Sequence, residues 1–325
     1  MLVIETRKLE KIYRTRVKSE GLGASFRALV KPEWKEIRAV GGIDLEVEQG
    51  ETLAFIGPNG AGKSTFIKML CGILHPSGGE ISVLGMSPEK ERRALAMRIG
   101  TVFGQKSQLW LHLPVLDSFT LLAAIYEISD AERRRRVDEL SELFELGAFL
   151  KTPVRKLSLG QRVRCEVAAS LLHDPELLFL DEPTIGLDVV VKQAIRELIS
   201  RRNRERGMTV FLTSHDPADI EQLCRRAVVI DRGVVALDSS VERLKSDYLG
   251  KKLVEVSFSS PQNIPELSGV TAVNREGGLK STLSVDTALC PIADVMERIS
   301  ALGNVLDITI NNPPMEEIIA DIFKH

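Results

Sequence analysis

The segment that most restricts the fold of this chain is GPNGAGKST, residues 57–65. It fits the P-loop pattern GxxxxGK[ST] and stands between a strand-like run, TLAFI, and a helix-like run, FIKMLCGIL, which is the context that this pattern requires. Glycines let backbone N–H groups turn toward a phosphate, and the start of the following helix adds partial positive charge. The sequence therefore predicts a strand, a phosphate-binding loop and a helix in that order.

Two side chains of this loop have an expected chemical role. Lys63 is expected to bridge the β- and γ-phosphates of a nucleotide, and the Ser64 hydroxyl to ligate Mg²⁺. The alternative is a glycine-rich turn that binds no nucleotide. The predicted nucleotide-binding residues of the loop are Gly57, Pro58, Asn59, Gly60, Ala61, Gly62, Lys63, Ser64 and Thr65.

Strand-like and helix-like runs alternate along most of the chain. The strand-like runs are 52–56, 177–180, 209–213 and 227–230, and helical patterns begin at 63 and span 190–206. This alternation favours an α/β fold with a mostly parallel sheet covered by helices. Residues 2–9 and 43–47 indicate strands of alternating character at an antiparallel edge, and residues 106–172 indicate a helical subdomain.

The segment 14–38 fits neither pattern and is interpreted as a basic insertion. It carries seven Lys or Arg residues and three Glu residues, with Phe26 and Trp34 as apolar anchors. Two interpretations stay open, contact with a partner subunit or anionic lipid headgroups on one side and a solvated basic loop on the other.

Composition excludes several classes of protein. The formal net charge of −2 provides no general attraction to nucleic acid, so no nucleic-acid partner is expected. The apolar runs are far shorter than the roughly 20 residues that a membrane-spanning helix needs. The four cysteines have no paired spacing, which favours small buried side chains in a reducing cytoplasm over disulfides or a zinc site.

Two acids end a second apolar strand, LLFLDEP, at residues 177–183. Ligands of α/β folds bind at the carboxyl ends of parallel strands, so Asp181 and Glu182 are expected beside the P-loop. Asp181 is suited to hold Mg²⁺ through its water shell. Glu182, on the other side of the strand's pleat, is suited to polarise an attacking water. The alternative is a salt-bridged strand end.

The motif LSLGQ, residues 157–161, stands before a helix-like run and upstream of the acidic strand. Taken alone, Ser158 would be an ordinary helix N-cap. Together with the P-loop and the acidic strand, the motif resembles the LSGGQ signature of the ABC ATPase family, with Leu159 in place of the first glycine. The resemblance implies that Ser158, Gly160 and Gln161 bind the γ-phosphate of ATP held by a second ATPase subunit.

Four further positions match that family. Gln105 matches the glutamine that touches Mg²⁺ and the water, with Gln108 as its rival, and His215 matches the switch histidine. Asp188 matches the loop that crosses between subunits, the alternative being a helix N-cap. Tyr13 matches the aromatic that stacks on adenine, although the insertion follows it and a buried core tyrosine is the alternative.

The resemblance covers residues 1–249 and implies a P-loop NTPase of the ABC type. Residues 250–325 read as a small α+β domain with strands at 252–257, 270–274, 282–285 and 305–310 and helices at 291–302 and 315–323. This tail resembles the accessory domain of ABC-2 exporters. It is interpreted as a regulatory or dimer-supporting module, with a stabilising extension as the alternative.

The implied function is ATP hydrolysis that drives an exporter. The partners would be integral-membrane permease subunits and a second ATPase subunit in a homo- or heterodimer, and the chain would sit at the cytoplasmic face of the membrane with ATP and Mg²⁺. A non-transport ABC ATPase acting on ribosomes or nucleic acid is the alternative. A P-loop kinase is a third class, but it would leave LSLGQ unexplained.

Overall fold

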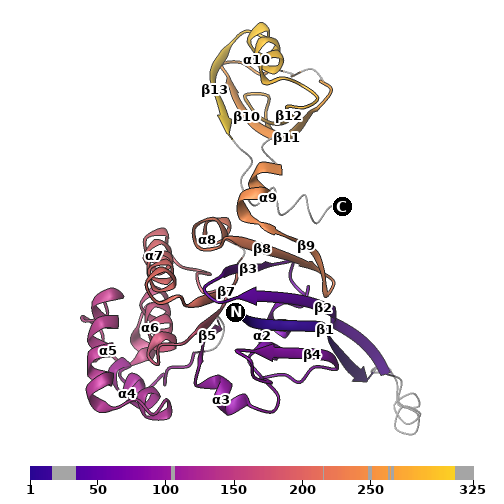
Figure 1. Ribbon diagram of the computed structural model, residues 1–325. Helices are drawn as coiled ribbons and strands as arrows, with labels where there is room; N and C mark the ends of the chain where they lie inside the picture. The colour runs from indigo at the N-terminus through magenta and orange to yellow at the C-terminus, as the bar shows by residue number, and fades with distance from the viewer. Residues whose placement is uncertain are drawn as a thin grey trace, which may run out of the picture. The chain divides into compact units, whose positions relative to one another are not determined.

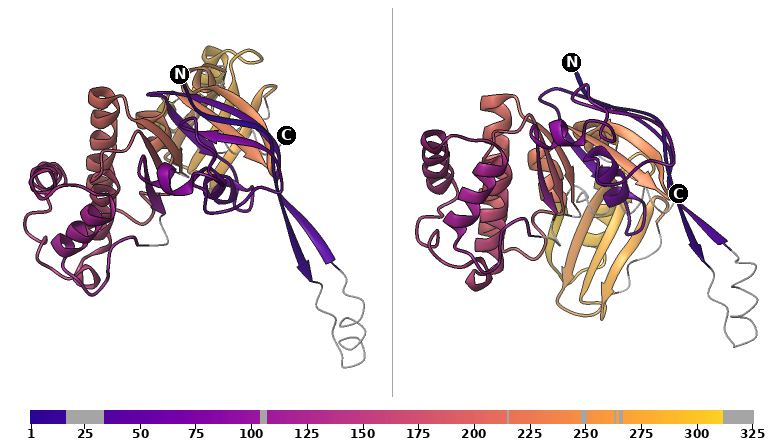
Figure 2. Two further views of the ribbon diagram at one scale, coloured as in Figure 1. Left: turned by 60° about the horizontal axis from the view of Figure 1, so that its bottom comes forward. Right: turned by 90° about the horizontal axis from the view of Figure 1, so that it is seen from below.

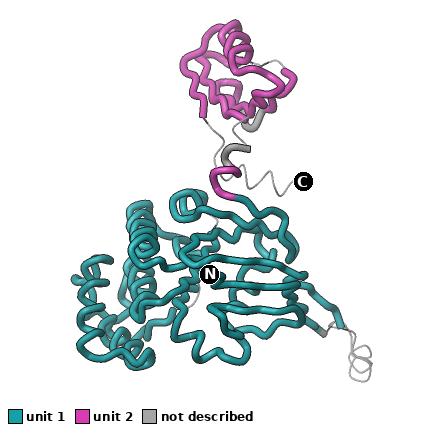
Figure 3. Tube along the Cα trace, viewed as in Figure 1, with its two compact units in different colours: residues 1–239 teal, residues 240–325 magenta. Residues whose placement is uncertain are grey.

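The computed structural model describes residues 1–16, 34–103, 107–214, 216–247, 251–262, 264 and 267–311. The chain divides into two compact units, unit 1 with residues 1–239 and unit 2 with residues 240–325 (Figure 3). This division falls before the domain boundary predicted after residue 249. Each unit is described by itself.

The central element of unit 1 is a six-stranded sheet in the order β5-β6-β7-β3-β8-β9. Its strands are β3 (Thr52–Ile56), β5 (Ile99–Phe103), β6 (Leu177–Asp181), β7 (Thr209–Thr213), β8 (Arg226–Asp231) and β9 (Val234–Ser240). The pairs β5–β6, β6–β7, β7–β3 and β3–β8 are parallel, which confirms the predicted α/β fold. Every residue of β3 and β7 is buried, as expected for central strands covered on both faces.

Helices α2 (Lys63–Leu70), α3 (Arg92–Ala96), α7 (Val189–Arg206) and α8 (Pro217–Leu223) belong to the same unit. The core beneath the P-loop is aromatic: Phe55 of β3 stacks on Phe66 of α2 at a centroid distance of 4.9 Å and lies 5.3 Å from Phe211 of β7. Because large apolar side chains of two strands and the helix meet here, α2 is held against the sheet.

A second, three-stranded sheet in unit 1 has the order β2-β1-β4 and is antiparallel. Its strands are β1 (Leu2–Arg16), β2 (Trp34–Glu48) and β4 (Gly78–Val83). The pairing of β1 with β4 ends at Glu10 and Gly78. Beyond that pair β1 and β2 run on together as a two-stranded ribbon, defined here as residues 12–16 and 34–38, which projects from the rest of unit 1 (Figures 1 and 2).

The ribbon differs from what the sequence predicted for the basic insertion at residues 14–38. Strand character was expected to end near residue 9 and to resume near residue 43, whereas both strands extend well into the segment 14–38. The reason is that the outer ends of both strands are exposed on both faces, so the alternation of apolar and polar residues that marks a half-buried strand is absent there. Residues 17–33 of the insertion lie outside the described residues.

The helical region of unit 1 contains α4 (Val115–Ile125), α5 (Asp130–Leu143), the short 3₁₀ helix at Val154–Lys156 and α6 (Leu159–Leu171). It lies at the opposite end of unit 1 from the three-stranded sheet (Figure 1). Ser129 caps α5 by accepting a hydrogen bond from the Glu132 N–H, which is the usual role of serine before a helix. Helix α4 packs against α5 and α6.

Unit 2 contains α9 (Val241–Asp247), β10 (Lys251–Phe258), β11 (Val270–Glu276), β12 (Lys280–Asp286), α10 (Ile292–Ala301) and β13 (Val305–Asn311). The four strands form an antiparallel sheet in the order β11-β12-β10-β13. Alternate residues of β10 and β12 pack with Val295 and Ile299 of α10. The helix predicted at 315–323 lies outside the described residues. Over the described parts of both units, no helix is long and apolar enough to cross a membrane.

Candidate active site

The P-loop connects β3 to α2 and has the backbone conformation that its glycines permit. Gly62 has φ +105°, and a Cβ atom added there would lie 2.2 Å from the carbonyl oxygen of Ala39. At Gly57 a Cβ would lie 2.5 Å from the carbonyl oxygen of Ile230. Both positions therefore require glycine, because any side chain would collide with neighbouring backbone.

Lys63 is the first residue of α2 and is buried. Its Nζ donates hydrogen bonds to the carbonyl oxygens of Gly57, at 2.6 Å, and of Pro58, at 3.2 Å. Desolvation lowers the pKa of Lys63, and the negative charges of Glu182 and Asp181 act in the opposite direction. A buried cation that the loop surrounds with its backbone, at the start of a helix, is suited to bind phosphate.

Asp181 ends β6 and connects the P-loop to β7. Its Oδ1 lies 3.5 Å from the hydroxyl oxygen of Ser64 and accepts a hydrogen bond of 2.6 Å from the hydroxyl of Thr213. Hydroxyl and carboxylate oxygens are the ligands that Mg²⁺ prefers, and Mg²⁺ commonly completes its shell with water and substrate phosphates. The described residues contain no cluster of three or more His, Cys, Asp or Glu that could hold a metal, so a Mg²⁺ ion would depend on such additional oxygens.

Glu182 lies beyond the end of β6, with a left-handed φ of +55°. Its backbone N–H donates to the Thr213 carbonyl at 3.0 Å, which holds the turn against β7. The sequence analysis had placed Glu182 by the pleat of the strand. The structure shows instead that this turn, which follows the last strand residue, sets the direction of Glu182. Positive φ is uncommon for a residue with a side chain and costs backbone energy, so the surrounding structure must maintain it.

The LSLGQ motif begins α6. Ser158 is the N-cap, because its hydroxyl accepts from the Gln161 N–H at 3.2 Å while the Gln161 side chain accepts from the Ser158 N–H at 3.0 Å. This capping box satisfies two backbone donors that would otherwise have no partner. A Cβ at Gly160 would make ordinary van der Waals contact with Val191 of α7 at 3.4 Å, so packing within this chain does not require glycine there.

Asp188 ends the loop that follows the acidic strand and caps α7 by accepting from the Val191 N–H at 2.9 Å. The cap that was the alternative for this residue is thus present. Around it the loop exposes apolar side chains: Ile185 is 60%, Val189 78% and Val190 79% exposed. Leu159 of the LSLGQ motif is exposed as well, and it lies beside Gly186 of this loop.

Comparison with known proteins matches the family described as ABC transporter over residues 40–185. A daunorubicin resistance ATP-binding protein of Streptomyces coeruleorubidus is 32% identical over 295 residues, which span 86% of this chain and 90% of that protein. The chain belongs to the ABC transporter family of ATP-binding proteins. The matched share exceeds unit 1, so the likeness extends into unit 2.

Two further comparisons agree with this assignment to the ABC family. A linearmycin resistance ATP-binding protein of Bacillus subtilis is 28% identical and matches 90% of this chain and 96% of its own. A dimeric structure of the ATP-binding cassette MJ0796 in a post-hydrolysis state with ADP and Pi superposes with a TM-score of 0.62 and 26% identity, over 73% of this chain and 98% of that one. The protein is therefore an ABC ATPase.

Of the remaining residues that match the ABC pattern, the structure describes some and leaves others out. Gln105 and His215 lie outside the described residues, and their roles stay predictions. The rival of Gln105, Gln108, uses its side-chain amide to donate to the carbonyl of Glu166 at 2.9 Å, so it is engaged with α6. Tyr13 lies in β1 opposite Ile37, with the Lys11 ammonium 5.5 Å from its ring centroid.

Sequence reasoning missed a buried cluster around Asp219 of α8. Asp219 is completely buried and accepts hydrogen bonds from Thr184 at 2.5 Å, Ser214 at 2.6 Å and Arg196 at 2.6 Å. Thr184 belongs to the loop after Glu182, and Ser214 precedes His215. The cluster therefore joins the two loops and α7, and no spacing pattern in the sequence marks it.

A second missed residue is Glu166 of α6, which is also buried. Its carboxylate accepts hydrogen bonds from the Ser107 hydroxyl and from the Gln108 N–H. The pKa of Glu166 is raised, because desolvation, the largest influence, outweighs the lowering of the pKa by these hydrogen bonds. Glu166 thus fastens the helix of the ABC signature to the segment that follows Gln105.

Proposed function

We propose that this protein powers an ABC exporter, with two ATPase subunits closing on two ATP molecules beneath integral-membrane permease subunits at the cytoplasmic face of the membrane. The observation that supports the ATP site most directly is the buried Lys63, enclosed by a glycine loop that the Ser64–Asp181 contact joins to the acidic strand. The resistance proteins among its relatives support export, and the dimeric cassette supports a pair of subunits.

In the proposed reaction, the P-loop and Lys63 hold the β- and γ-phosphates, and Tyr13 stacks on adenine. Ser64, Asp181 and Gln105 would hold Mg²⁺, which neutralises phosphate charge when it is bound. Glu182 accepts a proton from the water that attacks the γ-phosphorus, the bond from that phosphorus to the β-phosphate oxygen breaks, and ADP and phosphate leave. His215 contacts the γ-phosphate and Glu182.

The second subunit completes each site through its own Ser158, Gly160 and Gln161. Support for such a partner comes from the exposed apolar side chains at Ile185, Val189 and Val190, which would lose contact with water in a dimer. The crossing loop with Asp188 would then lie between the subunits. Homodimer and heterodimer are equally compatible with this arrangement.

The test uses Glu182→Gln. We expect the purified variant to bind ATP, to hydrolyse it at least about a hundredfold more slowly than the wild-type protein, and to elute as an ATP-bound dimer in gel filtration. Lys63→Ala should instead lose nucleotide binding. Near-normal turnover by Glu182→Gln would overturn the choice of the catalytic carboxylate.

The transport role is tested with the same trapped variant, tagged and expressed in its native cells. After mild detergent extraction with Mg-ATP, mass spectrometry should find polytopic membrane proteins at near-stoichiometric yield. Ribosomal proteins or nucleic acid in their place would refute the exporter role and leave the ATPase assignment intact.

A further inference from the structure

Thr213 is a polar residue at the end of a strand that is buried along its whole length. The three residues before it in β7 are apolar, and Thr213 itself is fully buried. A buried hydroxyl costs free energy unless it is hydrogen-bonded, so its partners indicate why the residue is there. Strands β6 and β7 are parallel, and Thr213 pairs in register with Asp181. The sheet therefore places this hydroxyl beside the acidic end of β6.

The hydroxyl of Thr213 contacts both acidic residues. It donates to Oδ1 of Asp181 at 2.6 Å and accepts from the backbone N–H of Glu182 at 3.2 Å. The Thr213 carbonyl accepts from the same N–H at 3.0 Å. A hydroxyl has one proton to donate, and here that proton is directed at the carboxylate while the oxygen receives the N–H. One side chain thus links Asp181 to the turn that carries Glu182.

These contacts orient both acids. The Asp181 oxygen that accepts from Thr213 also lies 3.5 Å from the hydroxyl oxygen of Ser64, so the bond from Thr213 holds the carboxylate toward the P-loop. Glu182 has a φ of +55°, which persists only where the surroundings maintain it. Two acceptor atoms of Thr213 hold the N–H of this residue.

We propose that Thr213 is a positioning residue for ATP hydrolysis, whose hydroxyl orients Asp181 toward Mg²⁺ and helps to fix the turn at Glu182. This inference rests on the proposed function, in which Asp181 holds Mg²⁺ and Glu182 accepts the proton of water. Groups that hydrogen-bond to a metal ligand fix its orientation, and their loss typically lowers metal affinity or activity about 10–100-fold. Thr213 acts through the two acids and touches neither metal nor nucleotide.

The variant that tests this role is Thr213→Val, which keeps the β-branched shape and removes the hydroxyl. The matched control is Thr209→Val, at the other end of β7. Thr209 is equally buried, and its hydroxyl accepts from the Gly50 N–H at 2.9 Å, so the control also removes a hydrogen-bonded hydroxyl. Thr213→Ser keeps the hydroxyl and should restore the wild-type behaviour.

Metal binding is measured without hydrolysis. Mn²⁺, which prefers the same oxygen ligands as Mg²⁺, is titrated into protein saturated with ADP, and free Mn²⁺ is followed by electron paramagnetic resonance against ADP alone. Thr213→Val should weaken Mn²⁺ binding about tenfold or more, whereas Thr213→Ser and Thr209→Val should stay within about twofold of the wild-type protein. ADP affinity in EDTA should be equal in all four proteins, because the P-loop is unchanged.

Turnover provides the second measurement. Thr213→Val should lower kcat about tenfold and raise the half-saturating Mg²⁺ concentration by a similar factor. The KM for ATP at saturating Mg²⁺ should change little, because Lys63 and the P-loop still hold the phosphates. A variant whose fold is merely weakened would lose active protein without a shift in its Mg²⁺ dependence.

Wild-type Mn²⁺ binding and turnover by Thr213→Val, together with inactivity of Glu182→Gln, would overturn this inference and leave the proposed function intact. An equal loss in Thr209→Val would also overturn it, because the effect would then belong to the sheet as a whole. If Thr213→Val does not fold, Thr213→Ala makes the same test without a methyl group beside the carboxylate. A wild-type protein that does not hydrolyse ATP would refute the proposed function and this inference with it.

Discussion

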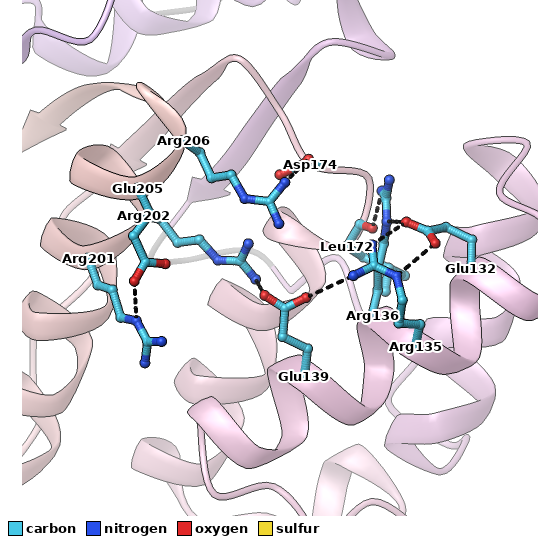
Figure 4. A network of polar contacts seen from close by, with 10 residues as sticks. All are labelled: Glu132, Arg135, Arg136, Glu139, Leu172, Asp174, Arg201, Arg202, Glu205 and Arg206. Atoms are coloured by element: carbon cyan, nitrogen blue, oxygen red, sulfur yellow. Dashed lines mark hydrogen bonds and ion pairs between the residues drawn. The ribbon is translucent and has the colours of Figure 1, made fainter.

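Two groups of arginines and carboxylates in unit 1 make the same kind of ion pair in different surroundings. In the Asp219 cluster the carboxylate is fully buried, and the Arg196 side chain is 6% exposed. On α5 and α7 a larger network joins Glu132 to Arg135 and Arg136 and joins Arg201 to Glu205 at the surface (Figure 4). The distances are alike, since the Arg196–Asp219 and Arg135–Glu132 pairs both measure 2.6 Å.

This difference shows that burial, and not distance, decides how much an ion pair contributes to the stability of the fold. The two arginines lower the pKa of Glu132 to about 2, yet solvent screens such a surface pair and it adds little to stability. Asp219 has no access to solvent, so every hydrogen bond that it loses would leave a buried donor unpaired. The buried cluster therefore holds the two loops in position, while the surface pairs contribute little to stability.

The largest effect is expected for Asp219→Ala, which should reduce the free energy of unfolding by about 3–5 kcal/mol. The reason is that the Arg196 charge stays buried while Thr184 and Ser214 lose their acceptor. Urea denaturation of the purified protein measures this loss. Asp219→Asn, which keeps the shape and one acceptor, is the gentler variant if the alanine variant does not fold. A loss below about 1 kcal/mol would mean that the cluster can rearrange.

For Glu166→Ala we expect a loss of about 2–3 kcal/mol, because two donors from residues 107 and 108 would lose a charged acceptor. Glu142→Ala, at an exposed position of α5, is the matched control and should be nearly neutral. The same denaturation experiment compares the two. Equal effects would show that the Glu166 hydrogen bonds do not fasten α6 to this segment.

His173 allows a test by pH. Its ring stacks on Tyr126 at a centroid distance of 3.8 Å and donates from Nε2 to the Ile99 carbonyl at 2.9 Å. Burial, the largest influence, lowers the pKa of His173 from 6.5 to about 4.

The folded state therefore keeps this histidine neutral while the unfolded chain takes up a proton below pH 6.5. The contribution of His173 to the free energy of unfolding is therefore fully present above pH 6.5. It falls as the pH decreases toward 4, by about 2 kcal/mol between pH 7 and pH 5. Denaturation curves at both pH values measure the fall. His173→Gln should remove that part of the pH dependence, and an unchanged dependence would contradict the assignment.

The smallest effect is expected in the surface network. Arg206→Gln removes an ion pair with Asp174 at 3.4 Å, in which both side chains are more than 40% exposed. The change should cost at most about 1 kcal/mol, and added salt should reduce it further. A cost comparable to that of Asp219→Ala would remove the distinction between the two groups.

Local patterns predicted much of the fold. The P-loop helix from Lys63, the parallel strands and the strand–helix order of unit 2 follow from hydrophobic periodicity and from glycine at defined positions. The outer ends of β1 and β2 could not be predicted in this way, since neither face of the ribbon is buried and the pattern of a half-buried strand is missing.

The residues of the candidate site also fall into those that local motifs predicted and those that they did not. Lys63, Ser64 and Asp181 were predicted from motifs, and the structure brings them together. Thr213, Asp219 and Glu166 were not predicted, because no motif marks them and each has a partner in another element, at separations of 32 positions for Thr213 and Asp181, 23 for Arg196 and Asp219, and 59 for Ser107 and Glu166.

The sequence by itself determined the loop chemistry and the parallel-sheet class, because a glycine-rich turn, a lysine and an apolar strand act over a few neighbouring residues. Only the tertiary structure decided which polar groups are buried and which residues share their hydrogen bonds. Burial depends on segments that meet in space, and the strength of an ion pair or the pKa of a histidine follows from that burial.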